Sequence, residues 1–307
     1  MKKIFFLLTV LTALLPLGAA DIFKFCPNDA NGALYLDFKA IFSHPRLSAV
    51  LKRDDVQKVI REKSMALGEN ITQWDEALAF FALSGDSSLA GFLVRSAALK
   101  YIPSWLALSG CKYSSAEING KDCFVIEDPY GATEKNVLTE LAPDVMLLTT
   151  EKDFSKIISL PRGNPAALPA MRQELPRKDA PVWLVADIMM PPLDGTPGVM
   201  QKYSLRLSGY FSPDGNTYAL DGYLLCPDKN IAQSLAMMGY FYTSSVSAAL
   251  FNRDEKLGRK VMKIFKFKPE GNKLVLRGKA NHDFIVTVLN YLEKNADMLQ
   301  SFAGVNF

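Results

Sequence analysis

Short turn signals between alternating apolar runs restrict the fold of this chain more than any other feature. Residues 212–217 read S-P-D-G-N-T, residues 268–273 read K-P-E-G-N-K, and residues 119–120 are Asn-Gly. Proline presets φ for the first position of a bend, glycine supplies a positive φ, and Asn-Gly favours a two-residue hairpin. The flanking residues alternate between apolar and polar, as they do in strands. The sequence therefore predicts antiparallel hairpins at these places.

The two proline phrases also raise the alternative of a calcium loop. Such a loop needs oxygen ligands at alternate positions and a closing glutamate. After Asp214 and Asn216 the next alternate position is Tyr218, which cannot serve as the third ligand. We therefore interpret the repeated phrase as a repeated bend. The known phosphate, dinucleotide and zinc motifs are absent as well, so no cofactor and no metal site is predicted.

Residues 1–20 have the pattern of a secretory signal peptide. Two lysines precede an apolar run over residues 4–15, and small residues precede a cut after Ala20. The run is shorter than the roughly 20 residues that a helix needs to span a bilayer. We expect export to the periplasm or the extracellular space, with no transmembrane span after cleavage.

The charge of the mature chain excludes some partners. Without Lys2 and Lys3, 33 basic and 32 acidic side chains remain, which is a formal charge of +1. Such a chain has no strong long-range field for nucleic acid or for an anionic membrane. The composition, 49% hydrophobic and 22% charged, is that of a globular protein.

The four cysteines, Cys26, Cys111, Cys123 and Cys226, allow three complete pairings in an oxidising compartment. A hairpin at residues 119–120 places Ala116 opposite Cys123, five positions from Cys111. At about 3.3 Å per residue this separation argues against a Cys111–Cys123 disulfide. The remaining pairings stay open.

Landmarks recur at an offset of about 150 residues. Asp37 and Asp187 each end a short apolar run, and Gly120 and Gly271 lie in hairpin turns. This offset indicates a duplication. The second copy has the expected order β, ββ, α, ββ, α, with strands near residues 182–187, 203–211, 217–225, 260–268 and 273–280 and helices after Asp228 and from His282.

We therefore predict an α+β fold of two pseudo-repeated halves, residues 21–160 and 182–307. Each half is expected to be a mostly antiparallel sheet of hairpins with helices packed on one face. Residues 161–181 contain five prolines and are predicted to be a linker. This tandem pattern resembles uncharacterised exported bacterial proteins with two α+β repeats. The resemblance implies no particular activity.

One tetrapeptide suggests catalysis. Gly85-Asp86-Ser87-Ser88 resembles the block that carries the nucleophile of GDSL hydrolases, which implies Ser87 as nucleophile and His282 as base. The family places an aspartate three residues before this histidine, where the present chain has Lys279, and it places the block nearer the mature N-terminus. The alternative is a turn of small residues between two apolar strands.

Other polar and aromatic residues allow two interpretations each. Asp37 and Asp187 either share one cleft for binding or acid–base chemistry, or end strands and cap the next element of the chain. His44 and His282 either act in catalysis or lie where helices are expected to begin. Tyr240 and Tyr242 belong either to a binding surface or to the core.

No complete catalytic set emerges from these residues. The sequence predicts a non-catalytic binding or interaction module of the cell envelope, whose partner is an unknown protein or a small apolar ligand. A secreted serine hydrolase acting through Ser87 is the alternative. A third interpretation is a protein that assists envelope assembly through exposed strand edges.

Overall fold

The computed structural model describes residues 21–45, 48, 52, 74–84, 87–96, 112–127, 135–162, 167–191, 198–212 and 215–295. The predicted signal peptide, Cys111, Gly85 and Asp86 lie outside these ranges. None of the described helices is both long enough and apolar enough to cross a membrane.

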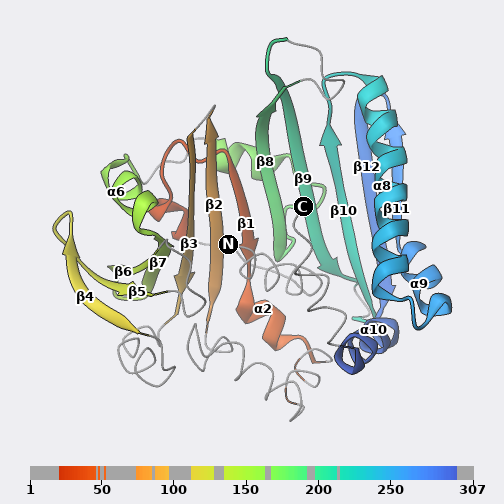
Figure 1. The fold of residues 1–307 in the computed structure, drawn as a ribbon, viewed down its shortest axis with the longest axis horizontal. Helices are drawn as coiled ribbons and strands as arrows, with labels where there is room; N and C mark the ends of the chain where they lie inside the picture. The colour runs from red at the N-terminus through yellow and green to blue at the C-terminus, as the bar shows by residue number, and fades with distance from the viewer. Residues whose placement is uncertain are drawn as a thin grey trace.

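One antiparallel sheet organises the described part of the chain (Figure 1). Its twelve strands follow the order β11-β12-β10-β9-β8-β1-β2-β3-β7-β6-β5-β4. The α+β class predicted from the hairpins is confirmed. The strands are β1 (Gly32–Leu36), β2 (Glu76–Ser84), β3 (Ser87–Arg95), β4 (Tyr113–Ile118), β5 (Lys121–Ile126), β6 (Asn136–Ala142), β7 (Val145–Thr150), β8 (Val182–Met190), β9 (Gln201–Phe211), β10 (Thr217–Leu225), β11 (Phe265–Glu270) and β12 (Lys273–Asn281).

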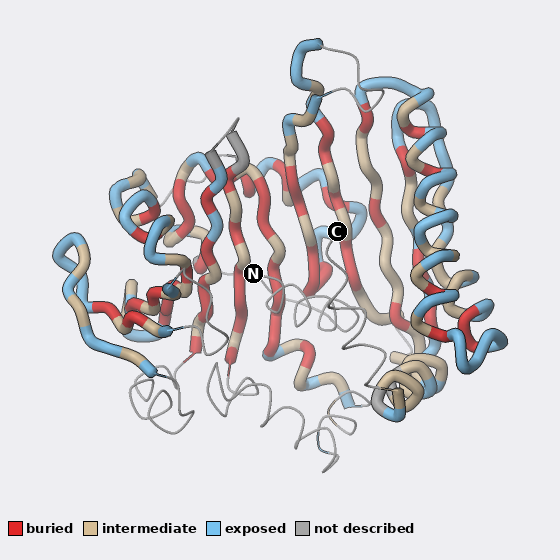
Figure 2. The backbone as a smooth tube through the Cα atoms, viewed as in Figure 1, coloured by how far each residue is buried: buried red, intermediate tan, exposed pale blue. Residues whose placement is uncertain are grey.

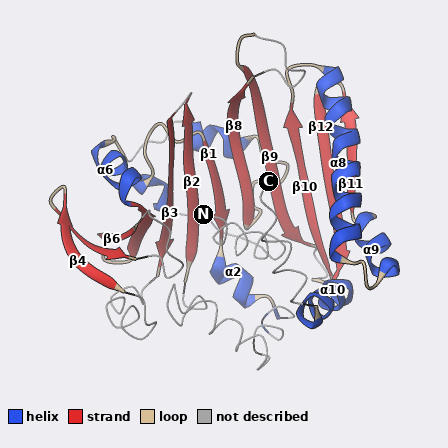
Figure 3. Cartoon of the chain, in the orientation of Figure 1, coloured by secondary structure: helices blue, strands red, loops and turns tan. Residues whose placement is uncertain are grey.

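Helices pack around this sheet, as Figure 3 shows by colour. Oxygen-bearing side chains cap several of them. Asp228, for example, accepts hydrogen bonds from the backbone N–H groups of Asn230 and Ile231 at the start of the longest helix. The described helices are η1 (Asp21–Phe25, a 3₁₀ turn), α2 (Phe38–Ser43), α6 (Glu151–Ser159), α7 (Ala167–Gln173), α8 (Lys229–Leu250), α9 (Glu255–Met262) and α10 (His282–Lys294).

The two predicted halves share a single sheet, because β1 pairs with β8. Tyr35 lies opposite Trp183 in this pairing, and their rings stack with centroids 5.2 Å apart. From this junction the strand order runs β1-β2-β3-β7-β6 in one direction and β8-β9-β10-β12-β11 in the other. By sheet position β11–β12 corresponds to β6–β7 and not to β4–β5. Gly120 and Gly271 therefore lie in hairpins at different places, and the duplication stays a prediction.

The proline-rich segment 161–181 contributes to the core. It contains α7, and its Leu168, Met171 and Leu175 are buried in the cluster that also holds Trp183. A linker role alone does not describe it, because apolar side chains spaced along a helix are buried wherever a sheet face is available.

Two apolar clusters cover the two faces of the sheet, and buried residues run along the strands (Figure 2). Phe154 and Ile157 of α6 join the larger cluster, whereas Phe38 and Ile41 of α2 join the smaller one on the opposite face. Helices of the first half thus lie on both faces and not on one.

The predicted turns form, and the two proline phrases differ in detail. Asn119 and Gly120, with φ of 54° and 71°, make a two-residue turn that sets Ala116 opposite Cys123 as predicted. Gly271, with φ of 62°, also lies in a two-residue turn, and Pro269 lies in edge strand β11. An edge strand tolerates proline because one side of its backbone has no strand partner.

Gly215, with φ of 66°, lies in the longer loop that joins β9 to β10. The same phrase therefore makes two different loops. One predicted boundary was wrong, because residues 260–262, expected to begin a strand, end α9.

Three of the four cysteines are described. Cys26, Cys123 and Cys226 are buried and form no disulfide. Burial raises the pKa of each thiol, because an apolar environment disfavours the thiolate.

Candidate functional site

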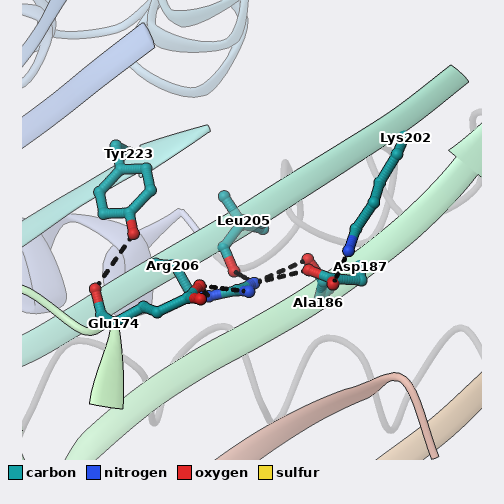
Figure 4. Close-up of polar contacts among 7 residues, drawn as sticks. All are labelled: Glu174, Ala186, Asp187, Lys202, Leu205, Arg206 and Tyr223. Carbon is teal, nitrogen blue, oxygen red and sulfur yellow. Dashed lines mark hydrogen bonds and ion pairs between the residues drawn. The ribbon is translucent and has the colours of Figure 1, made fainter. Parts of the chain in front are cut away.

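Asp187 lies in a polar cluster on the sheet, centred on Arg206 (Figure 4). Arg206 is on β9 and only 2% exposed. Its Nη1 donates to Asp187 Oδ1 at 2.9 Å, and its Nε donates to Glu174 Oε2 at 2.8 Å. The guanidinium therefore joins β8 to the segment after α7.

Further contacts complete this cluster. Lys202 Nζ lies 2.6 Å from Asp187 Oδ2, and the Tyr223 hydroxyl donates to the backbone carbonyl of Glu174 at 3.1 Å. Burial acts to raise the pKa of Asp187, but hydrogen bonds from Lys202, Arg206 and Ser204 outweigh it and lower the pKa. The buried charge of Arg206 is thus balanced by two carboxylates, which is the arrangement of a structural ion-pair network.

Asp37 has a different role, at the start of α2. Its Oδ1 accepts a hydrogen bond from the N–H of Ala40 at 2.8 Å, which makes it the N-cap. Burial raises the pKa of this carboxyl to about 6. The capping interpretation holds for Asp37, whereas Asp187 lies inside β8 and caps no helix.

Asp37 and Asp187 do not share a cleft. The N–H of Asp37 bonds to the carbonyl of Pro181, and the N–H of Asp187 bonds to the carbonyl of Asn31, at the other end of β1. Asp187 lies six positions after Pro181 along the strand, which is about 20 Å at 3.4 Å per residue. The two carboxylates therefore cannot act on one small substrate.

Ser87 and His282 are also far apart. Ser87 begins β3 at its hairpin with β2, whereas the N–H of His282 bonds to Asn216, in the loop before β10. Five strand spacings separate β3 from β10, about 24 Å at 4.8 Å each. A serine nucleophile needs its base within hydrogen-bond reach, so the sheet does not bring these two residues together.

His44 and His282 lie at the two ends of a row of aromatic rings, an arrangement that the sequence did not indicate. His44 stacks on Phe211 with centroids 3.9 Å apart, and Phe211 packs on Tyr218 at 4.9 Å. The Tyr218 hydroxyl lies 2.7 Å from His282 Nδ1. This row ties the end of α2 to the β9–β10 hairpin and to the start of α10.

Tyr240 and Tyr242 lie on the surface and not in the core. They belong to α8, which stands on one face of β11 and β12 at the end of the sheet (Figure 1). Tyr240 is 50% exposed and Tyr242 60%, and the neighbouring Phe241 reaches 77%. Met237 and Met238 are 69% and 63% exposed. We call these five side chains the α8 patch.

The inner side of α8 accounts for its position. Ala232 and Ala236 are buried, and a T-shaped contact joins Tyr240 to Phe267 of β11 with centroids 5.4 Å apart. The Tyr240 hydroxyl accepts a hydrogen bond from the N–H of Phe267 at 3.3 Å. Ala232 and Ala236 are buried, whereas the side chains of the α8 patch are at least half exposed. Figure 2 shows exposed residues along α8.

Charge is missing from this helix. After Lys229 at its start, residues 230–250 include no acidic or basic side chain. Large exposed apolar patches are a feature of protein–protein and membrane interaction sites and of ligand-binding grooves. Among the described residues no cluster of His, Cys, Asp and Glu could hold a metal ion.

Comparisons with known proteins add little to this geometry. No protein-family model matches the chain, and no curated protein matches it. Similar solved structures include three crystal forms of TP0453. Form III has 11% identity and a TM-score of 0.45, covering 88% of this chain and 98% of that one. Form I has 13% identity and a TM-score of 0.43, with coverages of 90% and 98%. Form IV has 13% identity and a TM-score of 0.44, with coverages of 88% and 97%.

Likeness at this level assigns no function. The described residues define an α+β protein with one large antiparallel sheet. At the end of that sheet lies a half-covered helix, which has no charged residue after Lys229.

Proposed function

We propose that this chain is an exported, non-catalytic interaction module of the cell envelope, which binds a protein partner through the α8 patch. One observation carries the proposal: five large apolar side chains, each at least half exposed, lie together on a helix that has no charge beyond its first residue. Apolar area of this kind gains free energy when a partner removes it from water.

Composition of the patch also supports a protein partner. Aromatic residues and methionine are enriched at the centres of protein interfaces, and charged residues are depleted there. Tyr240 is held by its contacts with Phe267, so part of the surface is ordered before a partner arrives. An ordered surface loses less side-chain entropy on binding.

The patch can be tested with a photoreactive residue. Benzoylphenylalanine is placed at position 241 or 238 of the full chain, which is then irradiated in cells of its natural host. The matched control position is Lys266, an exposed residue of β11. We expect a discrete cross-linked band from both α8 positions and none from position 266. The aspartate variant Phe241→Asp should abolish the band obtained from position 238.

Equal cross-linking at all three positions, or none at the α8 positions, would overturn the proposal. Export is checked in the same cells, because the mature chain should begin at Asp21 and its mass should correspond to residues 21–307. A mass that retains residues 1–20 would contradict the predicted signal peptide.

A further inference from the structure

We infer that the partner of the α8 patch is a second copy of this chain, and that two α8 helices pack antiparallel about a twofold axis between residues 239 and 240. This inference rests on the proposed function, since it names the occupant of the same surface. Closed twofold dimers are the commonest oligomers, and their interfaces are self-complementary.

One stripe of exposed residues along α8 has the symmetry that such a dimer needs. It contains positions 230, 234, 238, 241, 245 and 249, and residues 233, 237, 240, 242 and 248 are exposed beside it. The intervals are four, four, three, four and four, which read the same from both ends. An antiparallel partner therefore sets position 230 against 249, 234 against 245, and 238 against 241.

Side-chain size has the same symmetry. The central pair is large, Met238 against Phe241, and the next pair is small, Ser234 against Ser245. The outermost pair is Asn230 against Ala249. Large side chains thus meet where the helix axes cross, and small ones let the helices stay close on either side, as ridges packing into grooves require.

Electrostatics permits self-association here. A surface that pairs with its own copy brings like charges together, which is destabilising. No charged residue occurs in 230–250, so the patch carries no such repulsion. Antiparallel packing also sets the positive end of each helix dipole beside the negative end of its partner.

The exposed area is sufficient for a specific dimer. The five side chains of the α8 patch are 50 to 77% exposed. If a large side chain offers about 200 Å² when free, they expose on the order of 600 Å². A dimer contact that covers all five side chains on both copies would bury about 1,200 Å² in total, at the lower end of specific interfaces.

Self-association is measured on the purified mature chain by sedimentation velocity and native mass spectrometry over a dilution series. The dimer mass is expected at micromolar concentration. Phe241→Asp should raise the dissociation constant at least tenfold, because it places two carboxylates against the central methionines. The control Ser115→Asp adds the same charge on exposed edge strand β4 and should leave the constant unchanged. A monomer at all concentrations would overturn the inference.

Paired cysteines test the geometry. In the double variant Ser234→Cys with Ser245→Cys, each new thiol faces a thiol of the other copy, and mild oxidation should give a covalent dimer. Each single variant should stay monomeric in denaturing conditions, because the two copies of position 234 would lie about 16 Å apart along the axis at 1.5 Å per residue. The native chain, with its own cysteines, is oxidised in parallel. Cross-linking of a single variant at the rate of the double variant would contradict the antiparallel arrangement.

These outcomes separate the inference from the proposed function. A monomeric chain whose α8 positions cross-link in cells to a different protein, or a monomer that binds vesicles of neutral lipid through Phe241, would refute the second copy as occupant. In the first case the proposed protein-binding function would stand. A monomer without any cross-link at α8 would refute both.

Discussion

Gly239 of α8 lies directly against the ring of Phe267 on edge strand β11. A Cβ atom added at Gly239 would come within 2.9 Å of Phe267 Cδ1, closer than side-chain carbons approach in folded proteins. The helix therefore approaches the sheet as closely as it does because position 239 has no side chain.

We expect Gly239→Leu to lower the free energy of unfolding. Overpacking costs about 1–3 kcal/mol, and the better helix propensity of leucine recovers up to about 1 kcal/mol. Gln233→Leu, at an exposed position of the same helix, should change stability by less than about 0.5 kcal/mol. Urea denaturation at low protein concentration measures both. Equal effects would mean that α8 does not pack on Phe267 as described.

Substitution by alanine should lower the free energy of unfolding more at Gly215 than at Gly271. Both have positive φ, which costs a residue with a Cβ atom about 1–2 kcal/mol. Only at Gly215 would the new Cβ also meet a neighbour, His44 Nε2 at 3.1 Å, whereas nothing lies within 4 Å at Gly271. Gly215→Ala should therefore cost about 1 kcal/mol more than Gly271→Ala.

A His44→Ala background provides the control for this pair. Without the imidazole the extra cost of Gly215→Ala should disappear, because the new Cβ at position 215 then has no His44 ring to contact. Thermal unfolding of the four variants measures the difference. Persistence of the extra cost in the His44→Ala background would show that the imidazole is not its cause.

Asp37 should make stability depend on pH. Its pKa of about 6 in the folded chain lies above the ordinary value of 3.8, so the folded state binds more protons between those pH values. Stability is then highest below pH 4 with respect to this group, and it falls as the pH rises through 6. Asn also caps helices well, so Asp37→Asn should raise the free energy of unfolding at pH 7.5 by about 1–3 kcal/mol.

At pH 4 the same Asp37→Asn substitution should have little effect, because the carboxyl of Asp37 is then neutral. Asp37→Ala serves as the companion variant, because it removes the charge and the cap together. At pH 7.5 its free energy of unfolding should be about 1 kcal/mol lower than that of Asp37→Asn. Denaturant titrations at both pH values are the measurement. A larger stabilisation by Asp37→Asn at pH 4 than at pH 7.5 would contradict a raised pKa of Asp37 in the folded chain.

Substitutions in the ion-pair network around Arg206 should lower the free energy of unfolding by amounts that follow the burial of each side chain. Arg206→Ala removes the buried guanidinium that joins Asp187 to Glu174 and leaves Asp187 with only the exposed Lys202, so it should cost about 3 kcal/mol. Glu174→Ala should cost less than about 1 kcal/mol, because the Glu174 side chain is 55% exposed and its ion pair is screened by water. Arg206→Lys should also destabilise, since an ammonium cannot replace a planar guanidinium that reaches both carboxylates. Guanidinium chloride denaturation gives the ranking. A larger effect from Glu174→Ala than from Arg206→Ala would be inconsistent with the described burial.

The hairpins show how far local pattern can predict structure. Asn119–Gly120 between two alternating runs requires two positive φ values, and the structure has both, with the predicted register. Strand β10 and the start of α10 at His282 also lie where they were predicted, and Asn281 caps α10. These features depend on a few neighbouring residues, so the sequence is enough to predict them.

The candidate sites were harder to predict, because they depend on long-range strand order. Nothing near Asp37 or Asp187 shows that β1 pairs with β8 and sets these carboxylates at opposite ends. Nothing near Ser87 shows that five strand spacings lie between β3 and β10. The same holds for Tyr240 and Tyr242, since an apolar helix is interpreted as a core helix when its exposed side is unknown.

Adjacent residues are sufficient to specify the turns, the caps, the α+β class and the absence of charge along α8, because each of these depends on local chemistry. Packing between distant segments established three further features: both halves share one sheet, the two histidines meet through Phe211 and Tyr218, and the α8 patch faces outward. These three features depend on which distant segments pack together and exclude water. The packing of the whole chain determines those contacts, so no short stretch of the sequence is enough to predict them.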